Sequence, residues 1–151
     1  MRVYDARIEF TPTLWEVETT KLDTPESVQS YLRDVPETYP HQETFWVIFL
    51  TTRHHPIGRH LVSIGTATST LASPSEIFRA AILSGATRIV VAHNHPSGDP
   101  TPSTADLTVT RQLRDAARII GIELIDHVIL GRRELDPTGR GFYSFRCNGI
   151  V

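Results

Sequence analysis

The sequence predicts a single α/β domain in which helices cover both faces of a mixed sheet, a layered α-β-α arrangement. Short segments rich in β-branched and aromatic residues alternate along the chain with segments of helical periodicity. A chain of 151 residues is one domain of ordinary size and can enclose a substantial core. We expect residues 1–40 to supply an N-terminal strand and helix that lead into a domain over residues 41–151.

Two elements are expected in the N-terminal part. Residues 2–10 mix apolar and charged side chains in the manner of a first strand. Thr24 followed by Pro25 is typical of a helix start, with Thr24 as the N-cap and proline at the first helical position. We expect Pro36 and Pro40 to limit this helix to about three turns.

A central strand and its partner are expected next. Residues 43–51, ETFWVIFLT, are almost continuously apolar, which predicts a strand covered on both faces. Residues 60–68 alternate well enough to pair with it, and residues 53–58, RHHPIG, are expected to form the hairpin loop between the two strands. The capping-box pattern of residues 73–76 then begins a helix that ends before Gly85.

The second half of the chain continues the alternation of strand and helix. Residues 89–92 are apolar and β-branched, as in a buried strand, and a Pro- and Gly-rich loop follows them. A helical stripe starting near Ser103 ends at Gly121. Residues 122–130 and 142–145 are expected to be the last strands.

Two histidines follow the strand over residues 89–92. In an extended chain, residues i and i+2 point to the same side about 7 Å apart, so the imidazoles of His93 and His95 can meet at one ion. Ser103 and Asp106 open the next helix, whose first turn can bring the Asp106 carboxylate to the same point. Two imidazoles and a carboxylate leave one position of a tetrahedral Zn²⁺ open for water, the ligand count of a hydrolytic zinc site.

Each of these residues also has an explanation that needs no metal. Ser103 and Asp106 fit a helix start, where serine caps the helix and an acid suits the helix dipole. His93 and His95 could be a hydrogen-bonded pair at a strand end. Asp99 is an alternative ligand, although it occupies a typical turn position. We favour Asp106 as the third ligand, because a helix dipole explains an acid there but not two converging imidazoles.

The spacing His93-x-His95, seven residues, then Ser103-x-x-Asp106 resembles the signature of JAMM (JAB/MPN) zinc metalloproteases. The run HNHPSGDPTPS resembles the RadC branch of that superfamily, and the resemblance covers residues 41–146. It implies a JAMM, cytidine-deaminase-like layered fold. It also implies a zinc metallopeptidase or isopeptidase that cleaves amide bonds in a peptide or protein substrate.

The resemblance also implies two catalytic residues beside the metal ligands. The family's catalytic glutamate lies near the start of a strand upstream of the histidines, a position that Glu43 matches. Glu76 is the alternative general base, but the capping box already explains it. Ser103 matches the serine whose hydroxyl stabilises the oxyanion of the tetrahedral intermediate in that family.

A DNA-repair-associated accessory protein with structural or vestigial zinc is the alternative function. Long RadC proteins carry an N-terminal helix-hairpin-helix segment, which we do not expect in this sequence. The net charge of -2 and a pI near 6.4 provide no general attraction for polyanions. DNA binding is therefore supported only by a local cluster, made of Arg53, His54, His55, Arg59 and His60.

Composition narrows the remaining classes of function. No apolar run approaches the roughly 20 residues that span a bilayer, and the N-terminus has no secretory pattern, so we expect a cytoplasmic protein. Cys147 is the single cysteine, which rules out an intramolecular disulfide and the P-C-x-x-C element of zinc deaminases. Nothing in the sequence indicates an oligomeric state.

Overall fold

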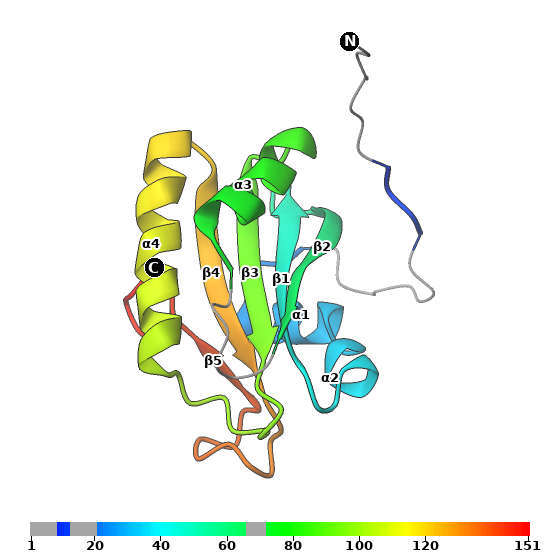
Figure 1. Cartoon of the computed structure of the whole chain (residues 1–151), viewed down its shortest axis with the longest axis vertical. Helices are drawn as coiled ribbons and strands as arrows, with labels where there is room; N and C mark the ends of the chain where they lie inside the picture. Colours follow the sequence, from blue (N-terminus) through cyan, green and yellow to red (C-terminus); the bar gives the residue numbers. More distant parts are fainter. Residues whose placement is uncertain (1–8, 13–20, 66–71) are drawn as a thin grey trace.

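The computed structural model describes residues 9–12, 21–65 and 72–151, and its centre is a five-stranded mixed sheet of order β2-β1-β3-β4-β5 (Figure 1). Most of the strand expected over residues 2–10, and residues 66–68 of the strand expected over 60–68, lie outside the described residues. The elements in chain order are α1 (Pro25–Tyr31), α2 (Val35–Thr38), β1 (Glu43–Leu50), β2 (Pro56–Gly65), α3 (Pro74–Leu83), β3 (Arg88–Asn94), α4 (Thr104–Ile120), β4 (Glu123–Leu130) and β5 (Phe142–Ser144).

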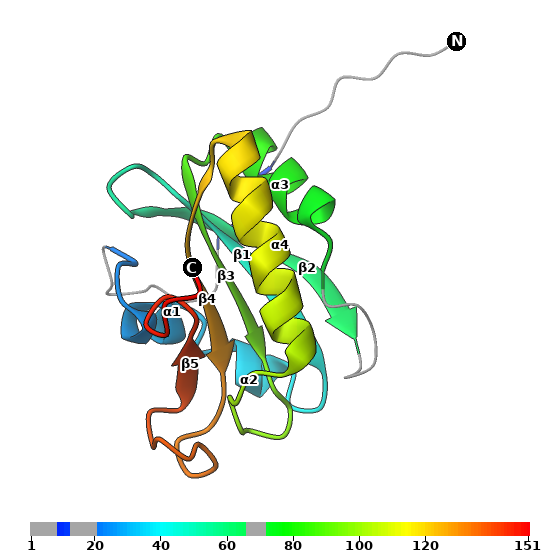
Figure 2. The same ribbon diagram turned by 90° about the vertical axis from the view of Figure 1, so that its left-hand side faces the viewer.

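Helices cover both faces of this sheet, which confirms the predicted layered α/β fold (Figure 2). On one face α3 and α4 pack with alternate residues of β1 and β3, including Phe45, Val47 and Val91. On the other face α1 and the start of α2 pack with the intervening residues, including Trp46 and Val90. The period of two along a strand thus divides one continuous apolar run between two cores.

The order of the strands places the ends of three elements together. β1 runs antiparallel to β3, with Phe45 opposite His93, and β3 runs parallel to β4 through the crossover helix α4. The start of β1, the end of β3 and the start of α4 therefore meet at one end of the inner strands, at the bottom of Figure 1. The predicted metal ligands lie at this end of the sheet.

Local sequence predicts where α1, α3 and α4 begin and where α4 ends. Thr24 caps α1, and at the start of α3 the Glu76 carboxylate accepts hydrogen bonds from the backbone N–H and the hydroxyl of Ser73. Gly121 ends α4 with φ 80°, a left-handed conformation that glycine adopts without steric cost. Among the described residues, no helix has the length and apolarity needed to cross a membrane.

Two expectations about the limits of elements were wrong. Pro36 does not end the first helix; α1 already ends at Tyr31, and Pro36 lies in the first turn of α2, where its missing N–H costs nothing. The expected loop over residues 53–58 is shorter, because β2 begins at Pro56. Since β2 is an edge strand and proline is its first residue, one absent donor does not disrupt the sheet.

Candidate metal centre

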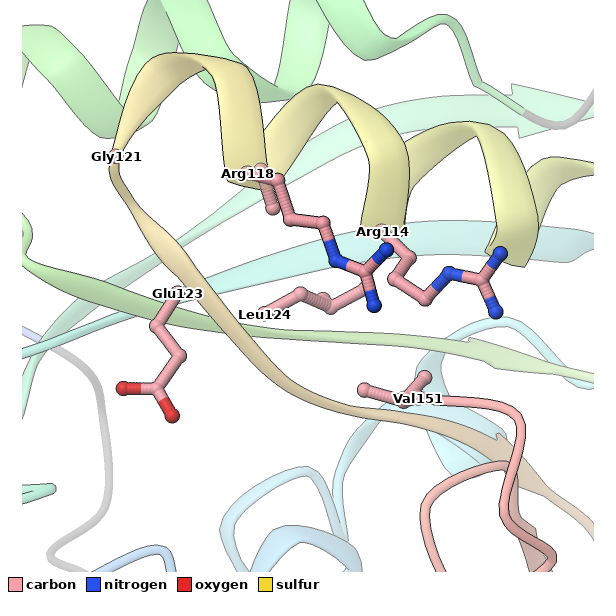
Figure 3. A pocket seen from close by; sticks show the side chains of 7 residues that line it. Arg114, Arg118, Gly121, Glu123, Leu124 and Val151 are labelled. Atoms are coloured by element: carbon pink, nitrogen blue, oxygen red, sulfur yellow. The ribbon is translucent and has the colours of Figure 1, made fainter.

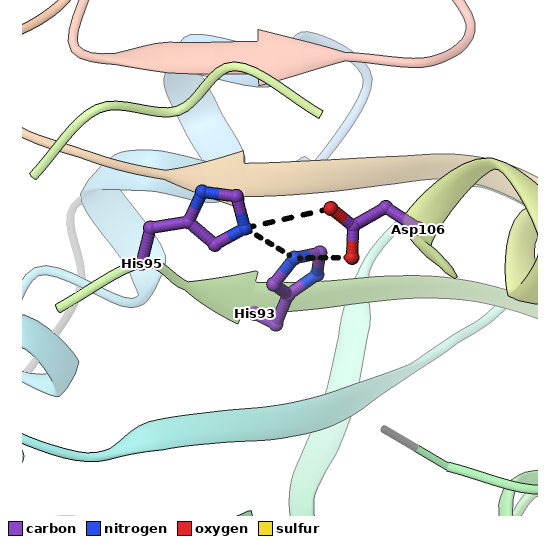
Figure 4. Close-up of side chains that lie close together, drawn as sticks. All are labelled: His93, His95 and Asp106. Atoms are coloured by element: carbon purple, nitrogen blue, oxygen red, sulfur yellow. Dashed lines mark hydrogen bonds and ion pairs between the residues drawn. The ribbon is translucent and has the colours of Figure 1, made fainter. Parts of the chain in front are cut away.

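The structure brings His93, His95 and Asp106 together (Figure 4). His93 is the penultimate residue of β3, His95 follows the strand, and Asp106 is the third residue of α4. The Nε2 atoms of the two histidines are 3.1 Å apart. His93 Nε2 lies 3.1 Å from Asp106 Oδ1, and His95 Nε2 lies 3.5 Å from Asp106 Oδ2.

These distances suit a single metal ion. Ligand atoms about 2.1 Å from a tetrahedral ion are roughly 3.4 Å from one another, close to the separations in this group. Among the described residues, this is the group of histidine and acidic side chains whose ligand atoms converge closely enough to hold a metal. His93 and Asp106 are buried and His95 is partly exposed, so the group opens to solvent on the side of His95.

One oxygen of the Asp106 carboxylate caps α4, and the other is available to a metal ion. Oδ2 accepts hydrogen bonds of 2.7 Å from both the backbone N–H and the hydroxyl of Ser103, completing a capping box at the start of α4. Oδ1 lies toward His93 and accepts nothing from the helix. Burial opposes ionisation of Asp106, but the adjacent His93 and His95 rings and the hydrogen bond from the Ser103 hydroxyl outweigh it and hold its pKa well below the usual range. Capping and metal binding are therefore compatible.

The loop after β3 orients His95. The backbone carbonyl of Asp99 lies 2.8 Å from His95 Nδ1, and because a carbonyl only accepts, Nδ1 must carry the hydrogen. A neutral His95 ring therefore directs the Nε2 lone pair toward His93 and Asp106. The Asp99 carboxylate accepts from the backbone and hydroxyl of Thr101. Asp99 thus contributes its backbone, and its side chain is not brought to the centre.

His95 is also the group of the centre that most readily takes up a proton. Burial alone would lower its pKa, but the Asp106 carboxylate, the Asp99 carbonyl and Glu43 raise the pKa of His95 above its ordinary value. His93 has no exposed surface, and burial lowers its pKa despite the nearby carboxylate. A positive charge between the three ligand atoms, from a proton or a metal, is therefore favoured on the side of His95.

Glu43 lies beside the centre and Glu76 does not belong to it. Glu43 is two residues before Phe45, which pairs with His93, so its side chain shares the sheet face of His93. Partial burial raises the pKa of Glu43, which also feels the opposing charges of His95 and Asp106. Glu76 is held by Ser73 at the start of α3, and these hydrogen bonds lower its pKa.

The sequence did not predict the role of Asn94, whose side chain joins the end of β3 to the start of β1. The amide of Asn94 accepts hydrogen bonds from the backbone and hydroxyl of Thr44 and donates to the carbonyl of Gln42. Asn94 lies between the two histidines in the chain and points to the opposite face of the sheet. Its amide therefore fixes the start of β1, with Glu43, against the end of β3. Polarity at the end of an apolar strand was the available signal.

The basic cluster that supported DNA binding is partly neutralised. Arg59 forms a two-pronged ion pair with Asp34, with both contacts at 2.7 Å, and its guanidinium lies over the Trp46 ring. The ring of His54 contacts Arg88. Because Arg59 is committed to an internal carboxylate, the cluster does not present its full charge to a polyanion.

A surface pocket elsewhere on the molecule is separate from the metal centre (Figure 3). It lies between the C-terminal half of α4 and the start of β4, and Arg118, Glu123 and Leu124 are among its lining residues. Asp106 lies at the opposite end of α4. This pocket therefore does not extend the centre.

A mixed sheet between two helical layers, with two histidines and an aspartate gathered at the end of its central strand, defines a layered α/β protein with a metal-type site. The chain belongs to the RadC-like JAB domain family, which matches residues 22–150. The match includes α1 and α2 as well as the residues 41–146 covered by the resemblance.

Curated relatives agree with this assignment. A UPF0758 protein of Acaryochloris marina is 56% identical over 90 residues, covering 60% of this chain and 37% of the relative. A UPF0758 protein of Trichormus variabilis is 47% identical over 116 residues, covering 76% of this chain and 47% of the relative. A UPF0758 protein of Thermotoga maritima is 40% identical over 129 residues, covering 85% and 54%. The chain thus spans about half or less of the length of these relatives.

Proposed function

We propose that this protein is a zinc-dependent hydrolase of amide or isopeptide bonds in a peptide or protein substrate. The convergence of His93, His95 and Asp106 on one point carries the proposal. Their nitrogen and carboxylate donors are the types that zinc accepts, and three protein ligands leave a fourth position open. Membership of the RadC-like JAB family supports the same chemistry.

The metal would supply one element of the reaction, and the chain supplies the rest. Zinc with an open position lowers the pKa of water toward about 7, so that hydroxide is available at neutral pH. His95 lies on the partly exposed side of the centre, from which substrate approaches. Burial of His93 and Asp106 excludes water from the opposite side and strengthens the electrostatic interactions there.

Glu43 is the proposed general base. It accepts a proton from the attacking water and delivers it to the leaving amine. The raised pKa of Glu43 suits this role, because a base of higher pKa takes up a proton more readily while still releasing it to an amine. The charges of His95 and Asp106 act on Glu43 and not on Glu76, which supports Glu43 as the base.

Ser103 is the proposed donor to the substrate oxyanion. In this structure its hydroxyl donates to Asp106 Oδ2, and the Ser103 backbone N–H donates to the same oxygen. Rotation of the hydroxyl toward the substrate leaves the backbone hydrogen bond to Asp106 in place. Loss of one such donor typically costs 10²–10³ in rate.

Metal analysis with a substrate screen tests the proposal. Purified protein should bind about one zinc per chain, and the zinc-loaded protein should cleave members of a panel of peptides and isopeptide-linked conjugates. His95→Ala should lose zinc and activity, whereas His41→Ala, at an exposed turn residue, should keep both. Absence of zinc in the wild type under metal-replete conditions would refute the site, and full activity of the metal-free protein would refute the mechanism.

A further inference from the structure

A buried chain of hydrogen bonds continues from the metal centre into the core. His93 Nδ1 lies 2.8 Å from His127 Nε2, and His127 Nδ1 lies 2.6 Å from the hydroxyl oxygen of Thr110. The Thr110 hydroxyl lies 2.6 Å from the backbone carbonyl oxygen of Asp106. Both His127 and Thr110 have no exposed surface. The chain of contacts thus starts at one ligand of the centre and ends on the backbone of another.

The positions of the hydrogens in this chain follow from its last contact. Two oxygens 2.6 Å apart need a hydrogen between them, and a carbonyl has none, so the Thr110 hydroxyl donates to Asp106. Its only hydrogen is then used, and His127 Nδ1 must donate to the Thr110 oxygen. A neutral imidazole has one N–H, so His127 Nε2 is an acceptor.

The same assignment of hydrogens extends to His93, the candidate metal ligand. Because His127 Nε2 accepts, His93 Nδ1 must donate to it, and His93 Nε2 carries a lone pair. That nitrogen is the one that lies toward His95 and Asp106. The Asp106 carboxylate on its own would favour the other tautomer, with the hydrogen on His93 Nε2, where it would block a metal.

Aromatic packing holds the His127 ring in place. His127 stacks on Phe145 at a centroid distance of 4.7 Å and an interplanar angle of 13°, and Phe45 contacts it from another side. His93 in turn stacks on Phe45 with an interplanar angle of 9°. The two imidazoles therefore have little freedom to turn away from each other.

We propose that Thr110 and His127 are positioning residues that hold His93 as the Nδ1–H tautomer and so direct its Nε2 lone pair into the metal centre. Neither residue reaches the metal or a substrate. Metal-ligating histidines commonly donate their second nitrogen to a carboxylate, carbonyl or water, and here a second histidine, oriented by a threonine, accepts that hydrogen. The inference rests on the proposed function only for the identity of the metal.

A matched pair of substitutions at Thr110 tests this relay of hydrogen bonds from Thr110 through His127 to His93. Thr110→Val keeps the shape but leaves His127 Nδ1 without an acceptor, so the single hydrogen of His127 should move to Nε2. His93 Nδ1 must then accept, and the hydrogen on His93 should move to Nε2. Thr110→Ser restores a hydroxyl and should restore the wild-type tautomer.

The measurement is the tautomer of His93, read from the ¹⁵N shifts of its ring in metal-free protein and assigned with His93→Gln. We expect Nδ1–H in the wild type and Thr110→Ser, and Nε2–H in Thr110→Val. In zinc competition with a chromogenic chelator, Thr110→Val should bind roughly tenfold more weakly and Thr110→Ser within about twofold of the wild type.

Two outcomes would overturn the relay: Nε2–H on His93 in the wild type, or an unchanged tautomer in Thr110→Val. The tautomer measurement needs neither zinc nor substrate. Failure of the wild type to bind zinc would therefore refute the proposed function, and the tautomer would still decide on the relay.

Discussion

Glu43 and Glu76 both lie at the start of an element, but their surroundings differ. Glu43 is partly buried and lies within the electrostatic influence of His95 and Asp106, whereas the carboxylate of Glu76 accepts the hydrogen bonds of the Ser73 capping box. A general base needs an unoccupied carboxylate beside the reacting water. The partial burial of Glu43, and the sheet face that it shares with His93, therefore favour Glu43 as the general base.

Glutamine substitutions separate the two residues. Glu43→Gln should retain zinc and lose turnover by about 10²–10⁴, because the amide keeps the shape but cannot accept a proton. Glu76→Gln is the matched control and should keep turnover, since glutamine also serves in a capping box. Steady-state kinetics with parallel zinc analysis gives the answer. Full activity in Glu43→Gln together with loss in Glu76→Gln would assign the base to Glu76.

Zinc affinity should depend on pH through His95. Zinc binds only the deprotonated Nε2 of His95. Because the pKa of His95 is raised, protons compete with zinc at pH values where an ordinary histidine is already deprotonated. Below that pKa, the zinc dissociation constant should rise about tenfold for each pH unit, and above it the constant should level off. The lowered pKa of His93 keeps that ring out of the competition. A chelator titration between about pH 6 and pH 8 would show the trend, and a flat profile would contradict it.

At the scale of elements, the loop that carries His95 is held by the last residue of β4 and by the segment that follows this strand. The backbone N–H of His95 donates to the Leu130 carbonyl, and the N–H of Arg132 donates to the Gly98 carbonyl at 2.7 Å. Gly131 lies so close that a Cβ there would come within 2.5 Å of the Gly98 oxygen and 2.7 Å of Pro100. Only glycine permits this approach, because it has no Cβ.

Gly131→Ala should therefore displace the loop and weaken zinc binding as well as stability. Gly139→Ala is the control: its φ of 71° disfavours alanine, but a Cβ there meets no atom within 4 Å. We expect both variants to lose about 1 kcal/mol or more of stability, and only Gly131→Ala to lose zinc affinity. Thermal unfolding of the metal-free protein and zinc competition measure the two effects. Equal zinc affinities in the two variants would show that the loop does not depend on this contact.

At the scale of the whole molecule, charge argues against a strong polyanion interaction. The net charge is -2, and Arg59 in the basic cluster is paired with Asp34. We expect this chain to bind duplex or single-stranded DNA more weakly than about micromolar at physiological salt. Fluorescence anisotropy over a salt series is the measurement. Submicromolar binding with a steep salt dependence would instead favour the DNA-associated alternative.

The fold class, most helix limits and the candidate metal ligands could be predicted from local sequence. Apolar runs, capping boxes and the glycine at the end of α4 predicted the layered fold and most helix limits, because these signals act within a few residues. The two histidines and Asp106 were also predictable, since they leave one strand and enter the next helix within 14 residues. The first-turn position of Pro36 and the start of β2 at Pro56 were not, because helix starts and edge strands tolerate a missing N–H that the rule of a breaking proline ignores.

The contacts that prepare the centre come from packing. Glu43 lies near His95, Asn94 holds Thr44, and His127 meets His93 because β1, β3 and β4 are neighbours in the sheet. These partners are 34 to 50 residues apart in the hydrogen-bonded pairs, beyond the reach of any local pattern. A shift of one residue in register would turn His127 to the other face of the sheet, because side chains alternate along a strand. Composition and spacing therefore predict the candidate metal ligands, and the pairing of the strands decides which residues orient them.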